Sequence, residues 1–454
     1  MATAMTRVHP NNAVLGWIED RLPILSFLSS HTSGYYAPKN FNFWYYFGSL
    51  ALLVLVNQIL TGIFLTMNYK PNAAEAFASV EYIMRDVEWG WLIRYMHSTG
   101  ASLFFVVVYL HMFRGVMYGS FKKPRELVWL LGMLIFLVLM AEAFMGYVLP
   151  WGNMSFWGAK VIISLFGAVP VIGDALVQWI MGDYLPADAT LNRFFALHVI
   201  ALPLVLLLLV VLHLAALHEV GSNNPDGVEI KQTKKPDGTP LDGIAFHPYY
   251  TVKDIFGTGV FLLIAAFIIF YAPTFGGWFL EHDNFIPANN LVTPSHIKPV
   301  WYFTPFYAIV RMIPAKLPGV IAMFGSIVLL FFFPWIDRGP VKSIRYRGLG
   351  YKIALALFVL SFIMLGAVGA GVTTEVIPEW FGANADLTTI ENLFGRFWTL
   401  VYFGFFVFLW AYTHFGFEKT KPVPDRIQLR SGARLKETSD TRWGVRKPSR
   451  FRVG

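Results

Sequence analysis

The sequence predicts an all-α polytopic membrane protein. Of its 454 residues, 56% are hydrophobic and only 14% are charged, a balance far from that of a soluble domain. The mean hydropathy is +0.53, and apolar runs long enough to cross a bilayer recur along the chain. These three observations together indicate eight transmembrane helices.

The elements are expected in a simple order along the chain. Residues 13–28 predict a surface helix, because polar and charged residues interrupt their apolar stretches. The expected spans are 43–67, 93–117, 127–148, 194–217, 255–275, 319–336, 351–372 and 396–414. Between them, the connections 149–193 and 276–318 are long enough to build functional surfaces.

This order divides the chain into five parts. They are an N-terminal segment (1–42), the first four spans (43–217), a loop (218–254), the last four spans with the 276–318 connection (255–415) and a basic tail (416–454). Four consecutive spans with short and long connections are expected to pack as a four-helix bundle. The basic tail is expected to be solvated.

Lys and Arg residues predict which side of the membrane each connection faces. With the N-terminus on the inner side, the inner segments carry 27 of the 36 Lys and Arg residues and the outer ones carry 9. Positive charge collects on the inner side of membrane proteins, so both termini are expected there. The net charge of +8 therefore reflects topology, and we expect no nucleic-acid partner.

Four histidines lie inside two of the apolar runs, His97 and His111 in the second and His198 and His213 in the fourth. Both runs go from outside to inside, so His97 and His198 share an outer level. His111 and His213 share an inner one. Intervals of 14 and 15 residues separate the two levels by about 21 Å and keep each helix's pair on one face.

Two facing helices with this pattern supply two bis-imidazole sites, which suit two six-coordinate haems b. The chain has no cysteine, which excludes disulfides, thiolate-bound iron–sulfur clusters and covalent haem attachment within it. Two histidines at one level would leave a tetrahedral zinc site half empty. A single buried histidine is explained equally well as a polar residue bonded to a carbonyl, but four at matched levels favour haem.

Glycines and arginines near the histidines support the same hypothesis. Two pairs of glycines repeat the 14-residue interval in the first and third spans: Gly48 with Gly62, and Gly132 with Gly146. Glycine leaves room for a flat macrocycle between close backbones. Arg94 lies three residues before His97 and Arg114 three after His111, so each guanidinium is expected to pair with haem propionates. The alternative is that both reach lipid headgroups.

Five segments resemble cytochrome b of the cytochrome bc1 complex: RYMHSTGASLFF at 94–105, GYVLPWGNMSFWGA at 146–159, HEVGSNNP at 218–225, HPYYTVKDI at 247–255 and PVWYFTPFYAI at 299–309. The resemblance implies an outer, low-potential haem on His97 and His198 and an inner, high-potential haem on His111 and His213. It also implies a Rieske iron–sulfur protein and cytochrome c1 as partners, a homodimeric complex, and a bacterial inner membrane with cytoplasmic termini.

The same resemblance implies two quinone sites. The outer, quinol-oxidising site is expected to use Phe144, Tyr147, Gly158, Pro299, Val300, Trp301, Tyr302 and Tyr307. The inner, quinone-reducing site is expected to use His218, Ser222, Lys253 and Asp254. A histidine and an aspartate can deliver protons to a quinone ring, and a lysine can relay them from water.

Two departures from the family pattern bear on mechanism. Most ubiquinol-oxidising members have Glu where this chain has Val300, so the carboxylate assigned to proton transfer is absent. Glu142 in the third span is predicted to take over as proton acceptor, or to remain a protonated hydrogen-bond donor. In the fourth span, 14 residues lie between the two histidines, whereas most family members have 13 there. A kink at Pro203 or a π-bulge is expected to absorb the extra residue.

The resulting expectation is a dihaem subunit of quinol–cytochrome c oxidoreductase, which oxidises quinol outside, reduces quinone inside and couples electron transfer to proton translocation (the Q cycle). Two alternatives stay open at this point. One is a dihaem quinone-reactive anchor of a dehydrogenase or hydrogenase. The other is a haem-free transporter that relays protons through its intramembrane His and Glu residues.

Overall fold

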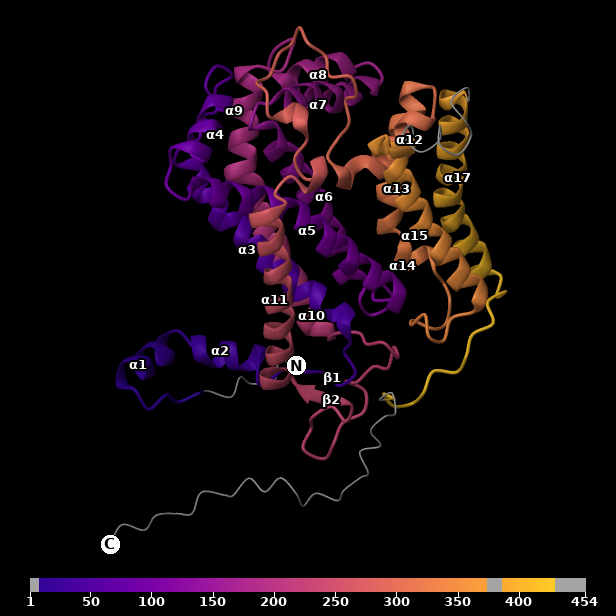
Figure 1. Ribbon diagram of the computed structural model, residues 1–454. Helices are drawn as coiled ribbons and strands as arrows, with labels where there is room; N and C mark the ends of the chain where they lie inside the picture. Colours follow the sequence, from indigo (N-terminus) through magenta and orange to yellow (C-terminus); the bar gives the residue numbers. More distant parts are fainter. Residues whose placement is uncertain (1–7, 374–385, 429–454) are drawn as a thin grey trace.

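The computed structural model describes residues 8–373 and 386–428 and is predominantly helical (Figure 1). Its one sheet among these residues pairs β1 (Tyr36–Pro38) antiparallel with β2 (Gly243–Ala245). The expected surface helix of 13–28 forms two helices, α1 (Ala13–Arg21) and α2 (Ile24–His31). Pro23 separates the two helices: it has no backbone N–H to continue the first helix, and it precedes the first residue of the second.

The N-terminal half forms the expected bundle of long helices. Its helices are α3 (Tyr46–Thr66), α4 (Ala76–Arg85), α5 (Gly90–Tyr118), α6 (Glu126–Val148), α7 (Asn153–Ser164), α8 (Gly173–Met181), α9 (Asp188–Ala196) and α10 (Leu202–Val220). Helix α3 packs along α5, and α10 packs along α6. The short helices α7, α8 and α9 lie over the upper end of this bundle in Figure 1.

A π-helical segment, Leu197–Ala201, joins α9 to α10. It contains His198 and ends just before Pro203, which occupies the first turn of α10. A π turn accommodates one residue more than an α turn. The predicted π-bulge is therefore confirmed, and it lies at the outer histidine itself.

The C-terminal half contributes α11 (Phe246–Tyr271), α12 (Thr304–Met312), α13 (Lys316–Phe331), α14 (Phe333–Ile336), α15 (Leu349–Ala370) and α17 (Leu387–His414). Among the described residues, seven helices are long and apolar enough to cross a membrane. The predicted span 319–336 is instead the 16-residue α13 followed by the short α14. The helix is interrupted at Phe332, because Pro334 in the first turn of α14 has no backbone N–H to donate to the preceding helix. The predicted count of eight transmembrane helices is therefore not confirmed.

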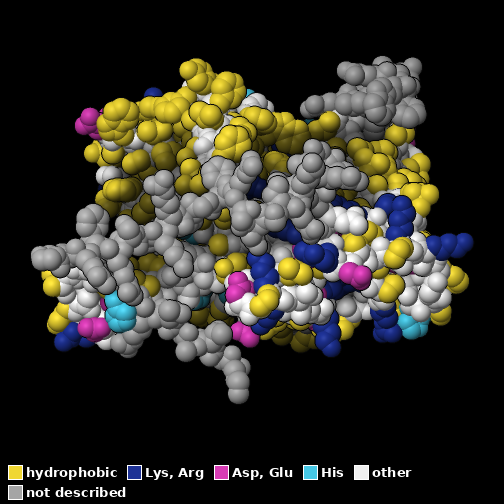
Figure 2. Space-filling view, turned by 90° about the horizontal axis from the view of Figure 1, so that it is seen from below, with side chains coloured by type: hydrophobic (Ala, Val, Ile, Leu, Met, Phe, Trp, Pro, Cys, Tyr) yellow, Lys and Arg dark blue, Asp and Glu magenta, His cyan; other side chains and the backbone are white. Residues whose placement is uncertain are grey.

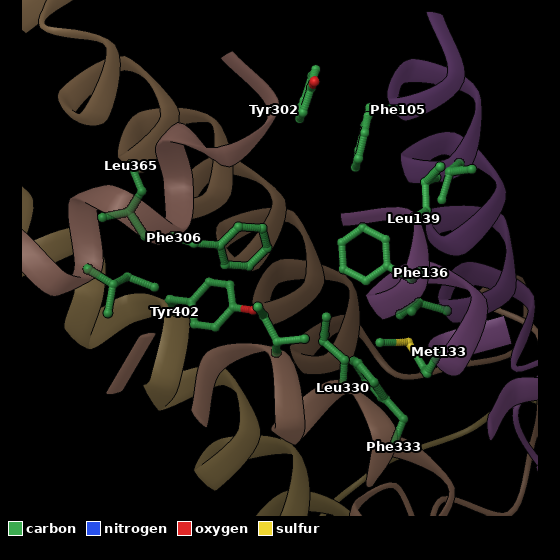
Figure 3. Close-up of a cluster of buried hydrophobic side chains, with 14 of the residues drawn as sticks. Phe105, Met133, Phe136, Leu139, Tyr302, Phe306, Leu330, Phe333, Leu365 and Tyr402 are labelled. Carbon is green, nitrogen blue, oxygen red and sulfur yellow. The ribbon is translucent and has the colours of Figure 1, made fainter. Parts of the chain in front are cut away.

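One buried apolar cluster joins the two halves of the chain. Figure 3 shows Phe105, Phe136 and Leu139 of the N-terminal bundle facing Phe306 and Tyr402 of the C-terminal helices. The aromatic rings of Phe105 and Tyr302 stack with centroids 3.9 Å apart. This contact positions the 299–302 segment against the bundle, close to the outer histidines.

Charged groups join the halves on the side that carries the β1–β2 sheet, where Figure 2 shows Lys and Arg side chains gathered. The fully buried guanidinium of Arg347 donates to both carboxylate oxygens of Asp337 at 2.6 and 3.1 Å and to Glu418 at 2.6 Å. Lys122 also pairs with Asp337, at 2.9 Å. Buried charges need such partners, because desolvation alone would expel them.

We expect Asp337→Asn to destabilise the protein by about 3 kcal/mol, because it leaves two buried cations short of a counter-charge. Thermal unfolding of the purified protein in detergent measures the loss. The control is Glu75→Gln, which breaks an ion pair with Lys70 whose side chains are 52% and 61% exposed and should cost less than about 1 kcal/mol. Equal effects of the two substitutions would contradict this account.

Candidate functional site

The structure brings the four histidines together in the two pairs expected from depth. His97 on α5 faces His198 with ring centroids 6.3 Å apart, and His111 faces His213 at 6.4 Å. A metal–imidazole bond is about 2 Å and the bonding nitrogen lies about 1 Å from the ring centre, so a metal between two opposed rings requires a centroid separation of about 6 Å. Both pairs fit the axial ligation of one iron each.

Each of the four predicted glycines lies against one histidine ring. A Cβ on Gly146 would lie 2.4 Å from Cε1 of His198, closer than atoms can approach. At Gly48, Gly62 and Gly132 the corresponding distances to His111, His97 and His213 are 3.4, 3.3 and 3.3 Å. The glycines therefore make room for the imidazoles, which fixes how far each ring stands from the neighbouring helix.

Hydrogen bonds determine the tautomer of the outer histidines. Thr61 Oγ1 donates to the Asn57 carbonyl at 2.6 Å, so it can only accept from Nδ1–H of His97, which lies 2.9 Å away. Nδ1 of His198 lies 2.9 Å from the carbonyl oxygen of Glu142 and donates to it. Both rings thus carry their proton on Nδ1 and keep Nε2 free for a metal.

The two arginines differ in their surroundings. Arg94 lines the same cavity as His97. Arg114 lies with its guanidinium 4.9 Å from the ring centre of Tyr45, and its buried Nε has no hydrogen-bond partner among the described residues. An unpaired buried guanidinium nitrogen is costly, and a propionate oxygen would satisfy it. The donors present therefore fit haem b.

The outer histidines open onto a cavity of about 430 Å³. Its wall includes Tyr147, Val300 and Tyr302 of the predicted quinol site, together with Glu142. The wall is mostly apolar with a few polar groups, which is the usual character of a binding site for a small hydrophobic ligand. The predicted haem and quinol sites are therefore parts of one continuous space.

The other predicted outer residues are not among those that line this cavity. Phe144 packs edge-on against Phe194 at 5.6 Å, and a Cβ on Gly158 would lie 3.7 Å from the Tyr147 ring. Trp301 Nε1 donates to Ser102 Oγ at 3.3 Å, the Tyr307 hydroxyl donates to the Ile297 carbonyl at 3.1 Å, and Pro299 is half-buried. Their roles as quinol contacts stay predictions.

Glu281 is a candidate that the sequence analysis missed. Its side chain is buried, and the Tyr147 hydroxyl donates to its Oε2 at 3.1 Å. Burial raises the pKa of Glu281 to about 7, which the hydrogen bond from Tyr147 offsets only in part. A carboxylate directly after the apolar run Trp278–Leu280 was the available clue.

The outer loop reaches Tyr147 because its backbone pairs with the chain around α7. Asn153 N donates to the Ile286 carbonyl at 2.9 Å, and Ala288 N donates to the Trp151 carbonyl at 3.0 Å. Asn284 Oδ1 accepts from Ser155 N at 2.9 Å. These contacts are remote in sequence, so no local pattern predicts them.

At the predicted inner site, the structure brings His218 and Ser222 together with two residues the sequence analysis missed. The rings of His218 and Tyr35 stack at 4.6 Å, and the hydroxyl oxygens of Tyr35 and Ser222 lie 3.0 Å apart. The ring of His31 also stacks on the ring of His218, with centroids 5.0 Å apart. Tyr35 and His31 precede the first span, and nothing in their local sequence marks them.

Lys253 and Asp254, the other two predicted inner residues, lie on α11. Lys253 is exposed, with Nζ 5.2 Å from the Tyr250 ring centre, and Asp254 is half-buried. Their part in a quinone site stays a prediction.

Comparisons with known proteins agree with this geometry. Residues 32–221 match the family model described as Cytochrome b/b6/petB, and residues 287–390 match Cytochrome b(C-terminal)/b6/petD. Cytochrome b of Allochromatium vinosum is 55% identical over 421 residues, which are 91% of this chain and 98% of that protein. Cytochrome b of Rickettsia prowazekii is 53% identical over 80% of this chain and 88% of its own length.

A solved structure described as a hyperthermophilic respiratory Complex III contains a chain that superposes on this one. Its TM-score is 0.78 at 35% identity, covering 88% of this chain and 99% of that chain. The similarity thus extends over both halves of the fold.

Gly146→Ala should remove the outer haem and spare the inner one, because the new Cβ would displace the His198 ring. Alanine has a higher helix propensity than glycine, so a loss of haem could not be attributed to a destabilised helix. The ratio of haem b to protein, together with the reduced-minus-oxidised spectrum, measures the loss of the outer haem. Gly259→Ala on α11 is the control, since nothing lies within 4 Å of its Cβ position; two intact haems in both variants would refute the packing argument.

Proposed function

The chain belongs to the cytochrome b family, as the electron-transfer subunit of a bc1-type complex III that oxidises quinol, and we propose that it holds two haems b and two quinone sites. The observation that carries this proposal is the arrangement of the four histidines as two facing pairs, one above the other along the bundle. The outer pair opens onto the cavity that Tyr147 and Tyr302 also line. The anchor and transporter alternatives explain neither the match over both halves nor this cavity.

His97 and His198 would hold the outer haem, and His111 and His213 the inner one. Arg94 and Arg114 would neutralise their propionates. When bound, the two haems supply one-electron carriers that lead from the outer to the inner side of the membrane. The glycine contacts hold the rings at fixed positions, so the chain keeps the ligands ready before any reaction.

At the outer site, apolar walls and the aromatic rings of Tyr147 and Tyr302 would bind the quinol ring. We propose that Tyr147 passes a quinol proton to Glu281, since its hydroxyl already donates to that carboxylate. Val300 cannot accept a proton. The role predicted for Glu142 remains a competing proposal, because Glu142 lines the same cavity.

At the inner site, His218 and the Tyr35–Ser222 pair would hold the quinone ring through stacking and hydrogen bonds. His218 can deliver a proton to a quinone oxygen. Asp254 and Lys253 would bring protons from the inner aqueous side. The outer and inner sites would then release and take up protons on opposite sides of the membrane.

The remaining parts of the proposal concern location and partners. A Rieske iron–sulfur protein would take one electron outside and pass it to cytochrome c1, within a homodimeric complex. The 27 Lys and Arg residues of the inner segments support an orientation with both termini on the cytoplasmic side. The similarity to cytochromes b of Allochromatium vinosum and Rickettsia prowazekii supports a bacterial inner membrane.

Inhibition of the purified complex tests the function. Antagonists of the outer quinol site and of the inner quinone site should each block steady-state electron transfer to cytochrome c, and their effects should be separable by which haem becomes reduced. A complex that responds to only one class would be a quinone-reactive anchor. A preparation with no haem α-band would support the transporter.

Glu281→Gln should slow quinol oxidation by on the order of 10²-fold, the usual contribution of a positioned proton acceptor. With a pKa of about 7, Glu281 is protonated below that pH and able to accept above it. The rate in the unchanged complex should therefore rise as pH increases through about 7, and the substitution should remove this step. Initial rates between acidic and alkaline pH measure both effects.

Two substitutions serve as controls for Glu281. Asp283, Lys298 and Tyr147 are the charged and titratable groups that act on it. Asp283→Asn removes a nearby negative charge, so the step should persist and move to lower pH. Glu142→Gln tests the competing acceptor: if it abolishes the step while Glu281→Gln does not, the assignment to Glu281 is wrong.

A further inference from the structure

Glu142 contacts a proposed haem ligand directly. Its Oε1 lies 3.0 Å from Nδ1 of His198, and its carbonyl oxygen lies 2.9 Å from the same atom. One N–H group is thus shared between two acceptors of one residue. A carboxylate that accepts from the outer nitrogen of a ligating imidazole makes that ligand more basic.

The inner level shows what is special about this contact. The 14-residue repeat that relates Gly146 to Gly132 also relates Glu142 to Val128. His198 has a carboxylate beside its Nδ1, whereas Nδ1 of His213 has no side-chain partner among the described residues. Val128 is buried and offers no polar side-chain atom.

The other helix pair repeats the difference. Thr61 lies 14 residues from Phe47, as Gly62 does from Gly48. Nδ1 of His97 has the Thr61 hydroxyl at 2.9 Å, whereas Nδ1 of His111 lacks a side-chain partner in the described part of the chain. Both outer imidazoles therefore have polar side-chain partners, whereas the corresponding inner positions, Phe47 and Val128, carry no polar side-chain atom.

From this asymmetry we infer that Glu142 is a positioning residue that lowers the reduction potential of the outer haem relative to the inner one. A more basic imidazole and a nearby negative charge both stabilise ferric over ferrous iron. Glu142 supplies both effects on His198, and Thr61 adds a weaker hydrogen bond on His97. The inference deepens the proposed function and rests on the two-haem assignment.

The burial of Glu142 suits this role. Its side chain is 16% exposed, and its second oxygen, Oε2, has no hydrogen-bond partner among the described residues. A buried carboxylate oxygen without a hydrogen-bond partner costs stability. A role in tuning the haem that His198 would hold accounts for this cost. A smaller difference in potential between the haems would weaken the driving force for electron transfer inward.

The test is a potentiometric titration of the α-band in the purified complex with Glu142→Gln. The amide oxygen can still accept from Nδ1–H, but the charge is lost, so the outer haem should become easier to reduce by about tenfold, or about 59 mV for one electron. The inner haem should not shift. Glu126→Gln on the same helix is the matched control, because it lies at the far end of α6 from Glu142, and it should change neither potential.

A second measurement covers the case in which the substitution prevents haem binding. In the unchanged oxidised complex, electron–nuclear double resonance of the Nδ1 protons should show a more strongly hydrogen-bonded ligand on the outer haem than on the inner one. Equal Nδ1 signals on both haems would overturn the inference. So would an outer potential that stays unchanged in Glu142→Gln with both haems bound.

These outcomes separate the inference from the function on which it rests. If the unchanged complex does not show two haems, the proposed function fails. If it shows two haems and Glu142→Gln alters neither potential, only the inference fails. If Glu142→Gln removes the pH-dependent step of quinol oxidation but shifts no potential, Glu142 is the proton acceptor and the inference is wrong.

Discussion

Four imidazoles buried among apolar helices impose the constraint on which the rest of this structure depends. An imidazole nitrogen buried inside a membrane without a partner costs free energy. The outer rings use Nδ1 to donate within the protein, to Thr61 and Glu142, and this leaves Nε2 for iron. The four glycines, the π segment and the pairing of α3 with α5 and of α6 with α10 all follow from holding these rings in place.

The C-terminal half depends on the bundle in turn. The stacking of Tyr302 on Phe105 and the buried Lys122–Asp337 pair hold its helices against the first half. The outer loop, paired with the chain around α7, then carries Glu281 to Tyr147. A carboxylate that is remote in sequence thereby lies beside Tyr147, which lines the cavity that the outer histidines open onto. In the proposed function, this arrangement would give the proton and the electron of a bound quinol separate routes.

The parts that follow local rules were predictable from sequence. Apolar runs located the long helices, the 14-residue interval identified the glycines that face the rings, and the extra residue between His198 and His213 predicted the π-bulge. The span at 319–336 was predicted too long, because hydropathy does not register the break at Phe332. Glu281, Tyr35 and His31 depend on contacts between distant segments. Glu142 was predicted as the proton acceptor because Val300 replaces the carboxylate of the family motif and Glu142 is an ionisable residue within the third span.

The central claim is that the two histidine pairs hold two haems in unlike environments. A potentiometric titration of the purified, unmodified complex, followed at the b-type α-band, tests it most directly. The account predicts two one-electron components of similar amplitude with distinct midpoint potentials, the lower of which belongs to the haem affected by outer-site ligands. A single component, two components with the same potential, or no α-band would contradict it.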